Sequence, residues 1–344
     1  MTQQPLRIGL VGTGRIGRVH AANIAASPGS TLQWVADPQI DGAREVAAAF
    51  GGTATESPDA IFGSGDVDAI LIASPTPTHV DLIARAVEHG IAVLCEKPID
   101  LDLARVDALR AVVNDSSAPV AVGFNRRFDP AFADVRARVA NGQIGPLEQL
   151  TIISRDPAPP PASYIEISGG IFHDMTIHDL DMARFFLPDI VEVSATGTCT
   201  FDSGACDHGD FDTAVVTLRA ACGALVTIIN SRHSAVGYDQ RLEAFGRGGM
   251  LQVANAPTSL VSLSTATSVE SRSPYQDFFL ERYAQAYRTE LAEFIALVRG
   301  EASDSASYDD GRAALILADA ARRAAIDRTV VELDQSVSVA TVTG

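Results

Sequence analysis

Lysine is almost absent from this chain of 344 residues. Lysine and arginine together number 26, and the single lysine among them is Lys97, which leaves 25 arginines. Arginine is therefore the ordinary cation of this protein, and a lone lysine indicates a position that requires a compact ammonium group. Acidic residues number 43, and the net charge of −17 excludes nucleic acid and anionic membrane as expected partners.

Cysteine and long apolar runs are also scarce. Four cysteines without a C-x-x-C spacing are too few for a disulfide framework, so we expect reduced thiols and a cytoplasmic protein. The sequence has no run of about 20 apolar residues that would span a membrane, and its N-terminus lacks the pattern of a signal peptide. A hydrophobic content of 47% fits a folded chain, whose length favours two domains.

Short apolar runs alternate with helical patterns over the first third of the chain. The expected strands cover residues 6–11, 32–36, 69–73, 92–95 and 120–123, and the expected helices cover 16–26, 42–50, 80–89 and 103–113. All-apolar strands separated by helices are typical of a parallel sheet that is covered on both faces. We therefore predict an α/β chain with an N-terminal, doubly wound Rossmann domain over residues 1–124.

The pattern changes after residue 124. Helices are expected at 130–139, 172–187, 278–299 and 311–327, and strand-like runs such as 150–154, 214–218 and 225–230 lie between them. The connections between these strands are short, which favours antiparallel pairing. Residues 125–344 are therefore predicted to form an α+β domain with a mainly antiparallel open sheet.

A glycine loop joins the first strand to the first helix. Gly12-Thr13-Gly14-Arg15-Ile16-Gly17 fits G-x-G-x-x-G, in which the glycines allow a tight turn, the approach of a pyrophosphate and close packing of the helix. Asp37, 20 residues beyond Gly17, is placed to bind ribose hydroxyls and to repel a 2′-phosphate, and Pro38 follows it instead of an arginine. The loop predicts NAD as the cofactor rather than NADP; the alternative is a glycine turn without a ligand.

Polar residues follow two other strands of this domain. Ligands bind beyond the carboxyl ends of strands in a doubly wound sheet, so Glu96-Lys97-Pro98 is aimed at the expected nicotinamide and substrate. The alternative for Lys97 is a solvated surface lysine, which the arginine-rich composition disfavours. Further cofactor contacts are expected after the strand at 69–73, from Ser74, Thr76 and His79. His79 is equally compatible with a contact at the start of the next helix.

Asp174 and His178 lie four residues apart in the predicted helix at 172–187, which places them on one helical face. A carboxylate beside an imidazole fixes its tautomer and makes it a better base. A purely structural Asp–His pair is the alternative. A metal site with His173 is another, but the i,i+4 pair supplies only two ligands and the adjacent His173 points elsewhere. We expect no metal.

Together these motifs resemble the glucose–fructose oxidoreductase/inositol dehydrogenase (Gfo/Idh/MocA) family. The resemblance covers residues 6–330 and is closest to the inositol 2-dehydrogenase branch. Besides the glycine loop, Glu96-Lys97-Pro98 and the Asp174/His178 segment, it rests on Gly123-Phe124-Asn125-Arg126-Arg127-Phe128-Asp129, Ser154-Arg155-Asp156-Pro157, Ser168-Gly169-Gly170, Gly237-Tyr238-Asp239-Gln240-Arg241 and Phe279-Leu280-Glu281-Arg282-Tyr283. His173 and the acidic stretch from Asp202 to Asp212 match none of its motifs.

The resemblance implies catalysis by Lys97, Asp174 and His178, and a C-terminal open sheet that supports dimers or tetramers, with a homotetramer expected. It also implies cofactor contacts around Gly12, Gly14, Arg15, Ile16 and Gly17, and at Asp37, Ser74, Thr76, His79, Glu96 and Lys97. A polyol substrate would meet Arg127, Asp156, Asp179 and Tyr238. The alternative for Arg127 is a pair with Asp129 or a place near the cofactor, and for Asp156 it is a cap on the Pro-rich loop. For Asp179 the alternative is support of His178, and for Tyr238 it is packing in the sheet.

The expected reaction is the NAD-dependent oxidation of a ring hydroxyl of myo-inositol to 2-keto-myo-inositol. Another inositol isomer, or an aldose oxidised at its anomeric carbon, would need the same residues. A non-catalytic NAD-binding regulator would have lost the lysine or the histidine, and both are present. A metal-dependent enzyme would lose activity with a chelator.

Overall fold

The computed structural model describes residues 4–201 and 203–333, which form two compact units. The first unit contains the chain up to Phe128 together with Ala286–Arg312, and the second contains Asp129–Gln285 and the chain from Ala313 on. Two consecutive domains divided after residue 124 were expected. The units differ from that division because residues 286–312 return to the first one.

A seven-stranded sheet forms the centre of the first unit, in the order β15-β6-β5-β4-β1-β2-β3. Only the edge strand β15 is antiparallel to its neighbour. The parallel order confirms the predicted doubly wound fold, with the reversal of strand order between β1 and β4, where such folds bind ligands. The strands are β1 (Leu6–Val11), β2 (Ser30–Ala36), β3 (Thr53–Thr55), β4 (Ala69–Ile72), β5 (Ala92–Glu96), β6 (Val120–Gly123) and β15 (Ala306–Ser307).

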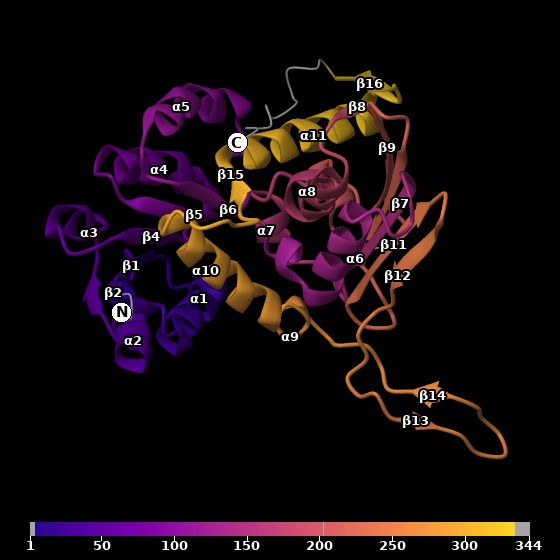
Figure 1. Ribbon diagram of the computed structural model, residues 1–344, viewed down its shortest axis with the longest axis horizontal. Helices are drawn as coiled ribbons and strands as arrows, with labels where there is room; N and C mark the ends of the chain where they lie inside the picture. Colours follow the sequence, from indigo (N-terminus) through magenta and orange to yellow (C-terminus); the bar gives the residue numbers. More distant parts are fainter. Residues whose placement is uncertain (1–3, 202, 334–344) are drawn as a thin grey trace. The chain divides into compact units, whose positions relative to one another are not determined.

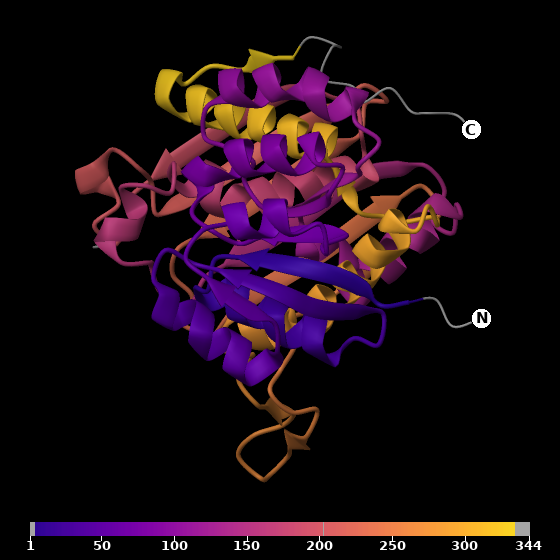
Figure 2. The same ribbon diagram turned by 90° about the vertical axis from the view of Figure 1, so that its left-hand side faces the viewer.

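Helices bury both faces of this sheet. On one face, Ile8, Leu10 and Leu71 pack against α1 (Arg15–Ala26), α2 (Ile40–Phe50) and α10 (Ala284–Val298). Figure 2 shows the N-terminal strands of the unit side by side, with indigo and violet helices along them. The connecting helices are completed by α3 (Asp59–Ser64), α4 (His79–Glu88) and α5 (Leu103–Asp115), with short 3₁₀ turns at Thr76–Thr78 and Asn125–Phe128. Because both faces are covered, the central strands β4 and β6 read as continuous apolar runs.

The second unit is built on a seven-stranded sheet in the order β12-β11-β7-β10-β9-β8-β16. β7 and β10 are parallel and the other neighbouring pairs are antiparallel, which confirms the predicted mainly antiparallel sheet. The strands are β7 (Leu147–Arg155), β8 (Ile190–Thr198), β9 (Thr213–Ala220), β10 (Leu225–Ser231), β11 (Asp239–Gly246), β12 (Gly249–Val253) and β16 (Val331–Glu332).

Only one face of this second sheet is covered by helices of its own unit. Alternate residues such as Leu150, Ile152 and Val216 are buried against α6 (Pro130–Ala140), α8 (Ile177–Phe186) and α11 (Tyr308–Asp327). Their neighbours along the strands point to the opposite face, which we call the open face. Short elements complete the unit: α7 (Ala162–Ile165), α9 (Phe279–Arg282), a 3₁₀ turn at Cys206–His208, and a hairpin of β13 (Ser262–Leu263) and β14 (Ser271–Arg272) that extends away from β12 (Figure 1).

The expectation of four reduced cysteines is wrong for one pair. Cys199 and Cys206 form a disulfide within the acidic stretch that matched no motif. Cys95 is buried with a free thiol, and burial raises the pKa of that thiol, whereas Cys222 is exposed. A spacing of seven residues is not a signature of a redox or zinc motif, so sequence spacing gave no reason to pair these two residues.

Candidate active site

The glycine loop has the geometry that its motif predicts. Gly12 has a φ of +97°, and a Cβ there would lie 2.5 Å from the carbonyl oxygen of Ala73. A Cβ on Gly17 would lie 2.0 Å from the carbonyl oxygen of Gly12. In contrast, a Cβ on Gly14 would meet nothing within 4 Å. The turn therefore needs Gly12 and Gly17 for its own packing, whereas Gly14 leaves an open space beside the backbone.

The open space at Gly14 fits a dinucleotide phosphate. Gly14 is the N-cap of α1 and supplies no side-chain acceptor, so the first amide groups of the helix have no side-chain cap. Uncapped amides and the positive end of the helix dipole favour an anion. Arg15 and Ile16 form the first turn of α1, where cofactor contacts were predicted.

Asp37 lies directly beside this loop, at the end of β2. Its Oδ2 accepts hydrogen bonds from the backbone amide and the hydroxyl of Thr13, at 2.8 and 2.7 Å, and its Oδ1 accepts from the amide of Gln39 at 2.8 Å. Burial opposes ionisation of the carboxyl, but these hydrogen bonds outweigh it and lower the pKa of Asp37. A fixed negative charge therefore stands where the adenosine ribose of a dinucleotide is expected.

The segment around Lys97 is held by two histidines of the same unit. Nε2 of His20 lies 2.8 Å from Oε1 of Glu96. His79 is buried, and its Nδ1 and Nε2 lie 2.8 Å from the carbonyl oxygens of Pro98 and Ser74. Lys97 itself is half-buried.

These contacts give His79 and Glu96 a structural role, and their cofactor contacts stay a prediction. Both ring nitrogens of His79 lie within hydrogen-bond distance of backbone carbonyl oxygens, so its side chain connects the end of β4 to the end of β5. The carboxylate of Glu96 is likewise directed to His20. Ser74 and Thr76 remain partly accessible beside them, as a cofactor contact requires.

The sequence predicted that Asp174 and His178 lie on one regular α-helix, but the helix changes type between them. Phe172–Thr176 forms a π-helical segment, and α8 begins at Ile177. A π-helical turn contains more residues than an α-helical one, so the i,i+4 spacing crosses a change of helix type. Single π-turns occur frequently at functional sites. The side chains of Asp174 and His178 are both half-buried.

Two donors hold the carboxylate of Asp174. The hydroxyl of Tyr164 donates to Oδ1 at 2.9 Å, and Nη1 of Arg232 lies 3.3 Å from Oδ2. Tyr164 is 44% exposed, but desolvation of its hydroxyl and the negative charge of Asp174 raise the pKa of the phenol, so Tyr164 stays a donor at neutral pH. Sequence reasoning singled out neither Tyr164 nor Arg232.

His173 points away from Asp174, as predicted, and supports the same segment from behind. Its Nδ1 lies 3.0 Å from the carbonyl oxygen of Gly169, and its Nε2 lies 2.8 Å from Oδ1 of Asp319 on α11. The side chain therefore connects the π-helical segment to α11. In the part of the chain that the structure describes, no three histidine, cysteine, aspartate or glutamate side chains gather as a metal site would require.

Asp179 is fully buried in a polar network, which argues against the predicted substrate contact. The hydroxyl of Ser154 donates to its Oδ1 and Nδ2 of Asn230 donates to its Oδ2, each at 2.7 Å. The hydroxyl of Thr176 in turn donates to Oδ1 of Asn230 at 2.7 Å. These bonds join α8 and the π-helical segment to β7 and β10, so Asp179 supports the segment that carries His178, which was the alternative interpretation.

Replacing Asp179 with alanine is expected to destabilise the protein. The hydroxyl of Ser154 and the amide of Asn230 would lose an acceptor in a buried site, at about 1–3 kcal/mol for each unsatisfied donor. Chemical unfolding measures the change. Asp134→Ala is the matched control, because Asp134 is an exposed carboxylate paired with Arg138 on α6. Equal stability of the Asp179 and Asp134 variants would show that the buried network contributes little.

The other three predicted substrate residues have mixed placements. Arg127 is buried and pairs with Asp310 at 3.5 Å, whereas its suggested partner Asp129 pairs with Arg282. Tyr238 is buried with its ring edge-on to another tyrosine. Asp156 is half-buried, and its charge acts on Tyr164, the residue that holds Asp174.

Comparison with known proteins finds family models that match the chain from residue 6 to 124 and from residue 132 to 252. Residues 6–124 match the model of an oxidoreductase family with an NAD-binding Rossmann fold, and residues 132–252 match the GFO/IDH/MocA C-terminal domain. Over 329 residues the chain is 45% identical to inositol 2-dehydrogenase of Rhizobium meliloti (strain 1021), which covers 95% of this chain and 99% of that protein. The chain belongs to the Gfo/Idh/MocA family.

Solved structures of Gfo/Idh/MocA proteins share the whole fold. A myo-inositol dehydrogenase from Corynebacterium glutamicum is 55% identical, with a TM-score of 0.93 over 96% of this chain and 99% of that chain. A scyllo-inositol dehydrogenase from Lactobacillus casei, solved with NAD(H) and scyllo-inositol, is 28% identical, with a TM-score of 0.88 over 95% and 99% of the two chains. This chain is therefore an NAD-dependent oxidoreductase that acts on CH–OH groups. Within residues 4–201 and 203–333, no helix is long and apolar enough to cross a membrane.

Proposed function

We propose that this protein oxidises one ring hydroxyl of myo-inositol to give 2-keto-myo-inositol. The observation that carries the proposal is the identity of 55%, over nearly the whole chain, to a protein named as a myo-inositol dehydrogenase. The candidate residues Lys97, Asp174 and His178 are all present.

The chemistry requires removal of a hydride from carbon and of a proton from oxygen. Bound NAD supplies the hydride acceptor. His178 accepts the proton from the reacting hydroxyl, because an imidazole titrates near neutral pH. Asp174, held by Tyr164 and Arg232, orients His178 and stabilises its charged form. Lys97 donates a hydrogen bond to the reacting hydroxyl and to a ribose hydroxyl.

Product identification tests this proposal. The purified protein is incubated with myo-inositol and NAD, and the products are analysed by mass spectrometry and NMR. We expect one NADH for each molecule of 2-keto-myo-inositol. A ketone at another ring position, or NADH formed only with an aldose, would overturn the assignment of substrate.

Asp37 is proposed to select NAD over NADP. Asp37→Ser is expected to lower kcat/KM for NAD by about 10- to 150-fold, because hydrogen bonds to charged groups contribute about 1.5–3 kcal/mol. Activity with NADP should rise when the repelling charge is removed. Asp41→Ser is the control, because Asp41 is an exposed carboxylate on α2. An unchanged NAD/NADP ratio in Asp37→Ser would exclude this role.

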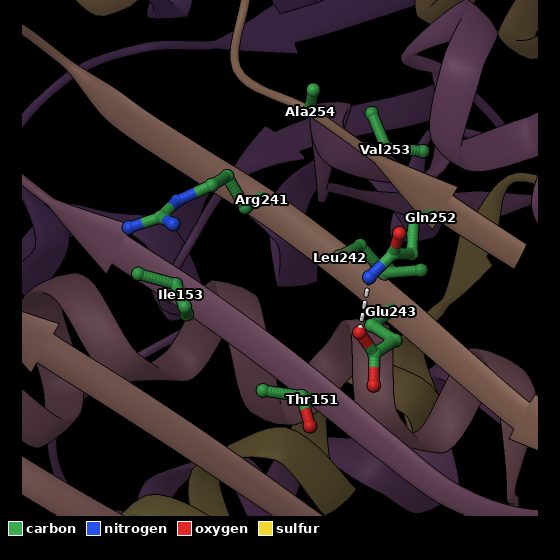
Figure 3. A pocket seen from close by; sticks show the side chains of 8 residues that line it. All are labelled: Thr151, Ile153, Arg241, Leu242, Glu243, Gln252, Val253 and Ala254. Carbon is green, nitrogen blue, oxygen red and sulfur yellow. Dashed lines mark hydrogen bonds between the residues drawn. The ribbon is translucent and has the colours of Figure 1, made fainter.

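The open face of the second sheet is proposed to bind a second copy of the chain, in a homotetramer built from dimers. Val215, Leu225, Phe245 and Met250 are each at least 40% exposed on or beside this face. A pocket of about 250 Å³ on the face contains no predicted catalytic residue; Figure 3 shows Arg241, Glu243 and Gln252 lining it, with Gln252 donating to Glu243. Large apolar side chains exposed together on one face favour an interface over a substrate site.

Light scattering of the wild-type protein and of a Val215→Asp/Phe245→Asp variant tests the interface. We expect a tetramer for the wild type and a smaller species for the variant. A wild-type monomer would contradict the proposal.

The cytoplasm stays the proposed compartment, since the reaction draws on NAD, although the Cys199–Cys206 disulfide removes the argument from reduced thiols.

A further inference from the structure

We propose that Arg232 is a positioning residue for the reaction, through its ion pairs with Asp174 and Asp210. The inference rests on the proposed function, in which Asp174 supports the base His178. Arg232 directly follows β10, and its side chain is completely buried. Nη1 lies 3.3 Å from Oδ2 of Asp174, and Nη2 lies 3.3 Å from Oδ2 of Asp210.

The burial of Arg232 makes these pairs significant. A buried guanidinium is retained only when its charge is compensated, and both carboxylates are themselves mostly buried. The planar guanidinium can bond two carboxylates at once, in a geometry that a lysine ammonium cannot reproduce. Arg232 therefore holds one oxygen of the Asp174 carboxylate, and Tyr164 donates to the other.

Asp210 connects this pair to the backbone of the π-helical segment. Its Oδ1 accepts a hydrogen bond from the amide of Ile171 at 2.9 Å, at the start of that segment. A Cβ on Gly170 would lie 2.6 Å from the same oxygen, and Gly170 has a φ of +86°. Gly170 is thus required both by its backbone conformation and by the approach of Asp210, which explains the double glycine before Asp174.

The acidic stretch that matched no motif holds Asp210 in place. The amide of Asp210 donates to the carbonyl oxygen of Ala205 at 3.0 Å, directly before Cys206, which is bonded to Cys199. The amide of Arg232 donates to the carbonyl oxygen of Asp212 at 2.8 Å. The described residues 203–212 therefore form a loop that presents one carboxylate to Arg232; Asp202 lies outside the described residues.

The charges around Asp174 give the proposal a specific consequence. The titratable groups around Arg232 and Asp174 include Asp210, Asp156 and the phenol of Tyr164, and Arg232 pairs with both Asp174 and Asp210. Without the guanidinium, Asp174 and Asp210 are two carboxylates without their shared cation, which disfavours the ionised form of Asp174. Removing the charge of Asp210 should then relieve part of the defect.

A double-mutant cycle with Arg232→Met and Asp210→Asn tests the proposal. We expect Arg232→Met to lower kcat by about 10- to 100-fold, as misplacement of a supporting group does. The KM for NAD should be unchanged. The acid limb of the pH profile of kcat should move to higher pH. Asp210→Asn alone should lower kcat less than Arg232→Met does, because Asp174 still compensates the guanidinium and the amide oxygen still accepts from Ile171. Arg232→Met/Asp210→Asn should be more active than Arg232→Met, and Arg232→Lys should lie between Arg232→Met and the wild type.

The controls separate positioning from folding. Arg184→Met removes another buried guanidinium, which donates to the carbonyl oxygen of Pro188, and should keep the wild-type kcat. Equal losses in Arg184→Met and Arg232→Met, or additive losses in the double variant, would overturn the positioning role. A wild-type protein that oxidises no polyol would instead overturn the proposed function, and the role of Arg232 with it. A normal pH profile and kcat in folded Arg232→Met, beside an active wild type, would overturn the role of Arg232 alone.

Discussion

Replacing His178 with alanine is expected to lower kcat by about 10²- to 10⁴-fold, the usual contribution of a positioned general base. His178 is half-buried in the first turn of α8, directly after the π-helical segment that carries Asp174. The hydroxyl of a polyol is a weak acid, so oxidation without a base must release its proton directly to water. Steady-state kinetics with the preferred polyol measure the loss.

The control for this substitution is His89→Ala. His89 is exposed at the end of α4 and belongs to none of the proposed sites. The His178 variant should bind NAD as tightly as the wild type, because the glycine loop and Asp37 are unchanged. Turnover near the wild-type rate in the folded His178 variant would show that another group takes the proton.

Replacing Lys97 with arginine is expected to lower kcat/KM by about 10²-fold or more, although the charge is kept. A guanidinium is larger and planar and presents its donors in a fixed fork, whereas an ammonium is a compact donor. A displacement of about 1 Å at a reacting group costs about 10²-fold in rate. The backbone on either side is fixed, because Glu96 bonds His20 and the carbonyl of Pro98 bonds His79. The segment therefore has little freedom to move back and accommodate a longer side chain.

Arg138→Lys is the reverse control, at an exposed pair with Asp134 on α6. Exposed ion pairs contribute about 0–1 kcal/mol, so this exchange should leave activity and stability close to the wild type. Full activity of Lys97→Arg would contradict the conclusion drawn from the composition, that the single lysine marks a requirement for an ammonium. Loss of activity in Lys97→Met with full activity in Lys97→Arg would show that charge alone is needed.

The repeating pattern of the sequence was sufficient to predict most of the fold. β1 and β6 have the predicted bounds, and α1, α2, α4 and α5 differ from prediction by at most two residues at either end. These elements bury a continuous apolar run or face, which periodicity detects directly. The short β3 and α3 were missed, since three strand residues and a helix of six carry too little periodicity.

Long-range contacts were the part that the sequence did not disclose. Residues 286–312 join the first unit because Leu291, Phe294 and Ile295 complete its core, and no local pattern indicates which sheet an apolar helix will cover. The π-helical segment differs from an α-helix by its hydrogen bonding and not by its composition. The Cys199–Cys206 pairing depends on how the loop folds back.

Composition indicated one residue of the proposed site but gave no indication of another. Lys97 was conspicuous because it is the only lysine, whereas Arg232 was one of 25 arginines and carried no such signal. Its importance follows from complete burial between two carboxylates, which only the fold shows. The sequence also did not indicate the contacts of Asp179 with Ser154 and Asn230, which support the segment that carries His178.

The most direct test of the central claim is the comparison of kcat/KM for NAD reduction across a panel of polyols and sugars with the purified protein. The panel contains myo-inositol, scyllo-inositol, other inositol isomers, glucose and xylose. We predict the highest kcat/KM with myo-inositol and NAD, with lower values for the other isomers and for the aldoses. A higher kcat/KM for glucose or xylose than for every inositol would contradict the proposed substrate.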